Sequence, residues 1–352
     1  MRIVMVCPDL KRVCGRTRMA MTLIHGLIES GEDITLVTNA ESDEGLYSGI
    51  AALETRIAPV GPNDKNVASM PKALQALRDA VKDADIVHTH HRYPAMLIEL
   101  LRPYRSFRHI TTVHSYLRGK RFFRFGSASV VAVSDSVKNF LMDRFSVPPA
   151  QIKVIPNGIE RSAATERATN TGTDFTVVAV GRFSREKGFD ILLEAWNIFL
   201  KEVTAPCRLL IAGSGEEESL LRSMADESVE FLGEVADMNS VYAQADAVVI
   251  PSREETVSYV LLESGDAGVP VVCSDVGGMA DIVEDGTTAR VFPSENSGAL
   301  ASMLQDVHSD KDSQDRIARA LQRVVHESYT NDAMISTYRE HYRNEFELLI
   351  ES

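Results

Sequence analysis

The feature that most constrains this chain is an alternation of short apolar runs with amphipathic segments, which occurs twice in succession along its 352 residues. Uninterrupted apolar runs of strand length are typical of strands buried on both faces of a parallel sheet. The segments between them place apolar residues at helical spacing, as in a helix that covers such a sheet. The order strand, helix, strand predicts an α/β fold, and its restart predicts two doubly wound parallel sheets in two Rossmann-like domains.

The first array spans residues 1–160 and the second spans residues 175–330, with a helical segment over 331–352 at the end. Residues 161–174 are rich in Thr, Ala and charged residues and have little to bury, so they are expected to form a linker. The expected strands are Arg2–Cys7, Ile34–Thr38, Ile86–Thr89, Ile110–Val113, Val130–Val133 and Ile152–Ile155, then Phe175–Val180, Leu209–Ala212, Val229–Leu232, Ala247–Ile250 and Val271–Cys273.

Composition excludes several classes of protein. No apolar run approaches the ~18–20 residues of a membrane span, and Ile3–Cys7 is too short for a signal peptide, so a cytoplasmic protein is expected. Four cysteines without paired short spacing predict neither a zinc site nor a disulfide framework. The net charge of −13 divides into +5 for residues 1–160 and −18 for the remainder, which argues against nucleic acid as a partner.

Polar residues gather directly after the expected strands. Because ligands of open α/β sheets bind beyond the carboxyl ends of the strands, we expect these residues to converge on a central cleft between the domains. They are Gly15 and Arg16, then His88, His90, His91 and His114 in the first array, and Gly181, Arg182, Lys187, Gly188, Gly213, Gly215 and Glu255 in the second.

One element combines a strand end, two carboxylates and a helix start. Glu255 follows the strand that ends at Ile250, a helical pattern begins at Ser258, and Glu263 lies inside that helix. The first amides of a helix and the positive end of its dipole bind phosphate well, which places a predicted phosphate site near Ser258–Val260. Flanking carboxylates then suit a nucleoside-diphosphate sugar, although two surface glutamates would give the same pattern.

Arg182 and Lys187 lie in one loop after a buried strand. Together they could neutralise a diphosphate without a metal ion, or they could be two solvated loop charges. Gly213-Ser214-Gly215 is a weaker signal, because a tight turn alone needs such glycines. His114 is open to a structural role or to contact with a sugar.

Two further features have two readings each. His88, His90 and His91 could suggest a metal site, but strand alternation sends His91 to the opposite face, which favours packing or an acceptor site. The stretch between Glu99 and Asp135 contains no acidic residue, and it is either a solvated face or a patch for anionic lipid headgroups or an anionic glycan. Its basic residues are Arg102, Arg105, Arg108, Arg118, Lys120, Arg121 and Arg124.

Taken together, the motifs resemble the family-four retaining glycosyltransferases of the GT-B fold. The matching pieces are Ile155-Pro156-Asn157-Gly158-Ile159, Gly181-Arg182 with Lys187-Gly188, Ala212-Gly213-Ser214-Gly215, Glu255-x7-Glu263, His114 and the loop at Gly15. The resemblance implies that Arg182 and Lys187 hold the donor diphosphate and that Glu263 binds the ribose. It also implies that the last helix returns to the first domain.

The other site residues follow from the same resemblance. Glu255 would face the transferred sugar, and His114 would touch that sugar from the opposite domain. The remaining donor-binding residues would be Gly15, Arg16, Gly181, Gly213, Gly215, Ser258, Tyr259 and Val260. Such enzymes generally need no metal or other cofactor. Two departures bear on donor choice: Thr256-Val257-Ser258 replaces the usual Pro/Gly-Phe-Gly, and Cys14-Gly15 replaces Gly-Gly.

The expected activity is transfer of a hexosyl unit from a UDP- or GDP-sugar to a hydroxyl of a glycan or glycolipid, in polysaccharide or lipopolysaccharide assembly. The protein would be cytoplasmic, with peripheral contact to an anionic membrane through the Arg102–Arg124 region. Two alternatives stay open, namely a sugar-nucleotide epimerase of the same fold and a non-catalytic partner subunit that binds a nucleotide-sugar. The motifs leave the donor base, the sugar, the acceptor and the oligomeric state open.

Overall fold

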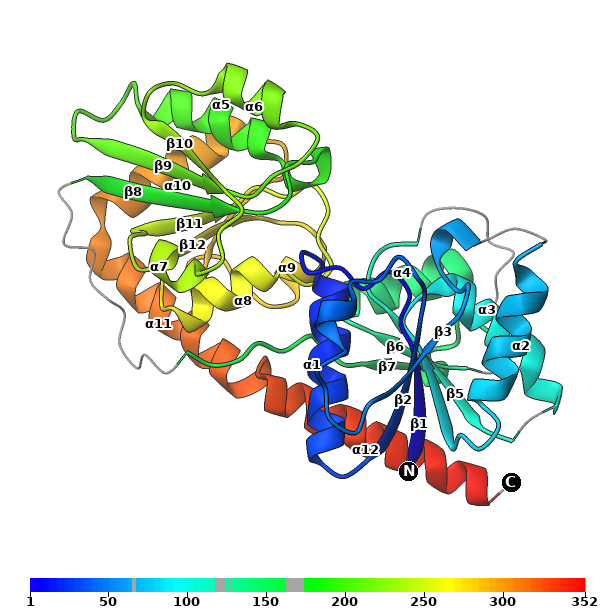
Figure 1. Ribbon diagram of the computed structural model, residues 1–352. Helices are drawn as coiled ribbons and strands as arrows, with labels where there is room; N and C mark the ends of the chain where they lie inside the picture. Colours follow the sequence, from blue (N-terminus) through cyan, green and yellow to red (C-terminus); the bar gives the residue numbers. More distant parts are fainter. Residues whose placement is uncertain (65–67, 105, 118–124, 127, 163–173, 352) are drawn as a thin grey trace. The chain divides into compact units, whose positions relative to one another are not determined.

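The computed structural model describes residues 1–64, 68–104, 106–117, 125–126, 128–162 and 174–351 (Figure 1). The chain folds as two units, one made of Met1–Gly158 with Asn331–Ser352 and the other of Ile159–Thr330. Most of the predicted linker, residues 163–173, lies outside the described residues. Within the described parts, no helix combines the length and apolar character needed to cross a membrane.

The first unit contains a seven-stranded parallel sheet with the order β3-β2-β1-β4-β5-β6-β7. The order reverses direction at β1, so the topological switch point lies between β1 and β4. The strands are β1 Arg2–Val6, β2 Asp33–Thr38, β3 Glu54–Ile57, β4 Ile86–Thr89, β5 Arg108–Val113, β6 Ser129–Ala132 and β7 Ile152–Val154. The helices are α1 Gly15–Glu29, α2 Met70–Ala80, α3 Arg92–Leu101, α4 Asp135–Phe145 and α12 Asn331–Ile350, with 3-10 turns η1 Glu44–Leu46, η2 Pro62–Asp64, η3 Arg102–Tyr104 and η4 Pro149–Gln151.

The C-terminal helix α12 is part of the core of the first unit, where it packs beside α1 (Figure 1). Gly26 on α1 permits this approach, because a Cβ there would lie 2.4 Å from Cδ1 of Ile335. The Tyr338 hydroxyl lies 3.0 Å from the Thr112 hydroxyl on β5, and that of Tyr342 lies 2.6 Å from Nδ1 of His88 on β4. These buried polar contacts fix α12 against the strands that carry the histidines.

The second unit contains a six-stranded parallel sheet with the order β10-β9-β8-β11-β12-β13. It is wound like the first, and its switch point lies between β8 and β11. The strands are β8 Phe175–Val180, β9 Cys207–Ala212, β10 Val229–Gly233, β11 Ala247–Ile250, β12 Val271–Ser274 and β13 Arg290–Phe292. The helices are α5 Phe189–Phe199, α6 Glu218–Met224, α7 Met238–Tyr242, α8 Tyr259–Asp266, α9 Gly277–Ala280, α10 Ser297–Ser309 and α11 Lys311–Ser328, with the 3-10 turn η5 Arg185–Lys187.

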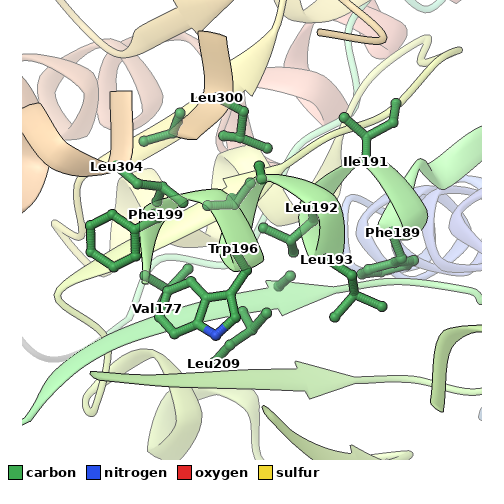
Figure 2. Packing of buried hydrophobic residues seen from close by; sticks show 14 of the residues in the cluster. Val177, Phe189, Ile191, Leu192, Leu193, Trp196, Phe199, Leu209, Leu300 and Leu304 are labelled. Carbon is green, nitrogen blue, oxygen red and sulfur yellow. The ribbon is translucent and has the colours of Figure 1, made fainter. Parts of the chain in front are cut away.

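Helix α5 anchors the loop that follows β8. Figure 2 shows Trp196 of α5 packed toward Val177 and Leu209 of the sheet, with Leu300 and Leu304 of α10 nearby. All five side chains are fully buried, and each contributes about 1.5–3 kcal/mol through loss of apolar surface from water. Phe189, Ile191 and Leu192 in the first turn of α5 are buried in the same cluster, so this turn is held on the sheet directly after the loop that carries Lys187.

The two doubly wound parallel sheets confirm the predicted fold class. Sequence reasoning missed one edge strand in each unit. Strand β3 reads Glu-Thr-Arg-Ile and is only partly buried, so it lacks an apolar run, and β13 has three residues. Helices α3 and α4 begin directly after His91 and Ser134, whose side chains cap their first turns.

Candidate functional site

Lys187 and Glu255 come together at the switch point of the second unit. Lys187 lies in the loop after β8 and Glu255 in the loop after β11, and the Lys187 ammonium donates a hydrogen bond to Oε2 of Glu255. Ser252 donates a longer bond of 3.4 Å to the same oxygen. The Glu255 side chain is 10% exposed and that of Lys187 is 32% exposed, so the pair joins a mostly buried carboxylate to a cation that still reaches solvent.

Glycines allow the loops at this sheet edge to approach one another. Gly188 has φ +67, and a Cβ there would lie 2.0 Å from the carbonyl oxygen of Pro251. A Cβ on Gly213 would lie 1.9 Å from the oxygen of Gly181, and one on Gly215 would lie 2.4 Å from the oxygen of Phe183. The Gly213–Gly215 motif thus has a steric reason in the packing of the loops after β8 and β9.

Helix α8 begins as predicted beside Glu255. Ser258 is its N-cap, is 3% exposed, and accepts a hydrogen bond of 3.3 Å from the Leu261 amide. Its hydroxyl is therefore directed to its own helix, while Tyr259 and Val260 in the first turn are partly exposed. The amides of such a first turn have no intrahelical acceptor, so this end of α8 favours an anion.

Glu263 projects from α8 and is held by a residue that sequence reasoning missed. The hydroxyl of Tyr242 at the end of α7 donates to Oε2 of Glu263 at 2.9 Å, and Tyr242 is 1% exposed. An aromatic residue in a short apolar segment such as Tyr242 is normally predicted to be a core residue. The sequence pattern therefore did not indicate that its hydroxyl binds a carboxylate.

Arg182 differs from Lys187, with which it was paired in the prediction. Arg182 follows Gly181, whose φ is +153, and its side chain is exposed. It forms no ion pair with the residues that the structure describes. The structure thus brings Lys187, but not Arg182, into contact with a site carboxylate.

In the first unit, Arg16 occupies the switch point between β1 and β4. It lies in the first turn of α1, directly after Gly15, and its guanidinium donates to the carbonyl oxygens of Pro8 at 3.0 Å and Asp9 at 3.2 Å. Cys14 is the N-cap of this helix. Burial raises the pKa of its thiol, but hydrogen bonds from Thr17 and the Arg16 charge outweigh burial and lower that pKa overall.

His114 is joined to His90 at the neighbouring strand ends. Nδ1 of His90 lies 3.0 Å from Nε2 of His114, and the rings stack with centroids 5.3 Å apart. Burial, assisted by the Arg16 charge, lowers the pKa of His90 to about 3. Burial and the charges of His90 and Arg16 place the pKa of His114 well below its usual range. Both imidazoles are therefore neutral near pH 7.

The other two histidines of this group are structural. His88 is fully buried between the hydroxyls of Tyr342 and Thr112, and Nδ1 of His91 accepts from the Tyr93 amide at 3.2 Å to cap α3. Among the described residues, no cluster of three His, Cys, Asp or Glu side chains has an arrangement suited to a metal ion.

The predicted basic patch is described only in part. Arg105, Arg118, Lys120, Arg121 and Arg124 lie outside the described residues. Arg108 forms an ion pair of 2.7 Å with Glu345 of α12, so its charge is neutralised within the fold. Of the aromatic residues in the same stretch, Phe107 and Phe125 are buried.

Two family models match the chain, one in each half. The model for Glycosyltransferase Family 4 matches residues 13–163, and that for Glycosyl transferases group 1 matches residues 174–310. A glycosyltransferase of Methanocaldococcus jannaschii is 28% identical over 88% of this chain and 89% of its own. The phosphatidyl-myo-inositol mannosyltransferase of Mycobacterium leprae is also 28% identical, over 86% of each chain.

A solved structure shares the fold across the whole length. Anabaena HepE, determined in complex with UDP, superposes with a TM-score of 0.81 at 17% identity, covering 98% of this chain and 100% of its own. The two doubly wound units therefore have the GT-B fold. The chain belongs to the family-four glycosyltransferases of the GT-B fold.

Proposed function

We propose that the protein transfers a hexosyl unit from a nucleoside-diphosphate sugar to a hydroxyl group of a glycan or glycolipid, with retention of anomeric configuration. The observation that carries the proposal is the Lys187–Glu255 pair beside the first turn of α8, at the switch point of the second unit. A cation, a carboxylate and a helix N-terminus in one place match the diphosphate and the hydroxyl groups of such a donor.

In this proposal the second unit binds most of the donor. Lys187 and Arg182 donate to the diphosphate, as do the amides of Tyr259 and Val260, and the glycines that follow β8 and β9 keep the backbone close to the ligand. Glu263, held by Tyr242, accepts hydrogen bonds from the ribose hydroxyls. Glu255 faces the transferred sugar.

The first unit supplies Gly15 and Arg16 to the donor and His114 to the sugar. Because its imidazole is neutral, His114 acts as a hydrogen-bonding group rather than as a charge. A neutral contact of this kind can orient a sugar hydroxyl without attracting the diphosphate away from Lys187.

The chemical step breaks the bond between the anomeric carbon and the phosphate oxygen, and the electron pair leaves with the diphosphate. The acceptor hydroxyl forms the new bond on the same face of the sugar and passes its proton to the departing phosphate oxygen. Lys187, Arg182 and the α8 amides stabilise the negative charge that develops there. The step needs no further reactant.

The comparisons support the choice of substrate class. HepE was solved with UDP, and the Mycobacterium relative is a mannosyltransferase for a phosphatidylinositol lipid. We therefore propose a UDP- or GDP-sugar as donor and a cell-surface glycan or glycolipid as acceptor.

Thermal-shift titration with UDP-, GDP- and ADP-sugars tests the donor, because a ligand of the native state raises the apparent stability. Transfer is then assayed with the best donor on a panel of glycan and glycolipid acceptors, with the anomeric configuration read by proton NMR. Conversion of the donor without an acceptor would indicate an epimerase instead. Donor binding without turnover on any acceptor would indicate a non-catalytic subunit.

We also propose that the first unit contacts anionic membranes at the cytoplasmic face. Met96 and Leu100 lie one helical turn apart on α3 and are 36% and 52% exposed, next to the basic stretch that begins at Arg102.

Flotation with phosphatidylglycerol vesicles tests this membrane contact. Leu100→Gln should weaken binding, whereas Leu220→Gln on α6, also 52% exposed, should not. Equal binding to phosphatidylcholine vesicles would contradict the proposal.

A further inference from the structure

Arg253 joins three segments at the carboxyl edge of the second sheet. Its Nη1 and Nη2 atoms donate to Oδ1 and Oδ2 of Asp190 at 2.8 and 2.7 Å, and Nη1 also donates to the carbonyl of Arg185 at 2.9 Å. Its Nε donates to Oε1 of Glu295 at 2.8 Å. The segments lie after β8, β11 and β13, so one guanidinium links loops that are distant in sequence.

The ion pair between Arg253 and Asp190 is well formed and partly buried. The Arg253 side chain is 18% exposed and that of Asp190 is 29% exposed. The two parallel bonds between guanidinium and carboxylate are the strong, directional form of this interaction. The Arg253 bond, opposed by burial, keeps the pKa of Asp190 below its usual range, so both partners stay charged.

These contacts join the two loops that carry Lys187 and Glu255. Arg253 belongs to the loop of Glu255, and its backbone amide donates at 2.8 Å to the carbonyl of Glu186, the neighbour of Lys187. Asp190 lies in the first turn of α5, just after Lys187 and Gly188. The two loops are thus attached to each other through the Arg253 side chain and through backbone hydrogen bonds to Glu186.

We infer that Arg253 is a positioning residue, which fixes the loops after β8 and β11 so that Lys187 and Glu255 keep the separation that donor chemistry requires. That Arg253 fixes the two loops follows from its contacts with them. That this affects catalysis rests on the proposed function. Arg253 touches no substrate in this inference and acts through Asp190 and Glu186.

Arginine is needed here for its shape as well as its charge. A lysine could reach one carboxylate oxygen but could not span both oxygens of Asp190 together with Glu295 and a carbonyl. Glutamine removes the charge and leaves Asp190 partly buried without its partner. Arg253→Lys should therefore weaken the attachment of the two loops less than Arg253→Gln does.

The test compares Arg253→Gln and Arg253→Lys with Arg290→Gln. Arg290 is 23% exposed and forms ion pairs with Asp306 at 2.7 Å and Asp285 at 3.9 Å. Both partners lie outside the two loops, so Arg290 is a matched control. Arg253→Gln should lower kcat at least tenfold while donor affinity changes less than threefold, and Arg253→Lys should retain an intermediate kcat. Arg290→Gln should stay within twofold of the wild type in both.

Hydrogen exchange provides a readout that does not depend on activity. Arg253→Gln should raise amide exchange in residues 185–190 and 251–257 together, with the rest of the unit unchanged, and Arg290→Gln should leave both loops unchanged. Asp190→Asn should raise exchange in the same two segments but to a smaller extent, because the Arg253 bonds to Arg185 and Glu295 remain. The double variant should be no worse than Arg253→Gln alone, since that variant already removes the Asp190 contact.

Two results would overturn the inference. The first is equal behaviour of Arg253→Gln and Arg290→Gln in kcat and in loop exchange. The second is a uniform rise of exchange across the second unit, which would mean that Arg253 stabilises the whole unit and not the two loops. If the wild type transfers no sugar from any donor, the proposed function fails, and hydrogen exchange still decides the role of Arg253.

Discussion

The ammonium of Lys187 donates to the carboxylate of Glu255, although the two residues are 68 positions apart and follow different strands. The contact exists because β8 and β11 are neighbours at the point where the strand order reverses. Since Glu255 is only 10% exposed, Lys187 both neutralises a mostly buried carboxylate and presents positive charge at the sheet edge. That double role makes Lys187 the most informative single position in the second unit.

Replacing Lys187 by alanine should reduce sugar transfer by about 100-fold or more, the loss typical when a group that stabilises developing charge is removed. Lys201→Ala is the matched control, because Lys201 is exposed just beyond the end of α5. Initial transfer rates at saturating donor would measure the effect. Near-normal rates for Lys187→Ala would refute the assignment of Lys187 to the diphosphate.

The fold was predictable because most strands of both sheets are continuous apolar runs, as in Ala247–Ile250. Lys187 and Glu255 could each be selected for their places after strands, but their contact depends on a strand order that the sequence does not state. Arg253 was missed for the same reason. An arginine in a polar loop is normally predicted to be solvated, and the partner of Arg253, Asp190, lies 63 positions away in the sequence.

The hydroxyl of Tyr242 should matter for donor binding more than for the chemical step. Tyr242→Phe removes the 2.9 Å bond to Glu263 and leaves the aromatic packing in place. A net loss of about 1 kcal/mol corresponds to roughly a fivefold rise in donor KM. Tyr338→Phe, which removes a buried hydroxyl contact with Thr112 in the first unit, should leave donor KM unchanged. An unchanged KM in Tyr242→Phe would exclude this role for the hydroxyl.

Cys14 should be the first cysteine to be alkylated. Its lowered pKa increases the reactive thiolate at a given pH, while burial raises the pKa of Cys7 and of Cys273 to about 12. Mass spectrometry after brief iodoacetamide treatment at pH 7.5 should show Cys14 labelled before Cys207, whose pKa burial also raises. Because Gly15 is proposed to contact the donor, saturating nucleotide should slow the labelling. Preferential labelling of Cys207 would contradict the first expectation.

The buried histidines of the first unit should make the protein sensitive to mild acid. Burial is the first cause that lowers the pKa of His88, His90 and His114, so the folded state binds their protons at a lower pH than the unfolded state does. The free energy of unfolding should therefore be constant above a pH of about 6.5 and fall below it, by about 1.4 kcal/mol per pH unit for each such histidine.

Urea titrations followed by circular dichroism at pH 7.5, 6.5 and 5.5 measure this slope. His90→Asn should reduce the slope by about one proton's contribution, because the pKa of His90 falls to about 3 in the folded state and asparagine does not titrate. His25→Asn is the matched control, since His25 is exposed on α1. A slope that stays the same in His90→Asn would mean that the His90 imidazole is protonated inside the fold. In that case the His90–His114 pair would carry a charge, and His114 could not act as the neutral sugar contact proposed for it.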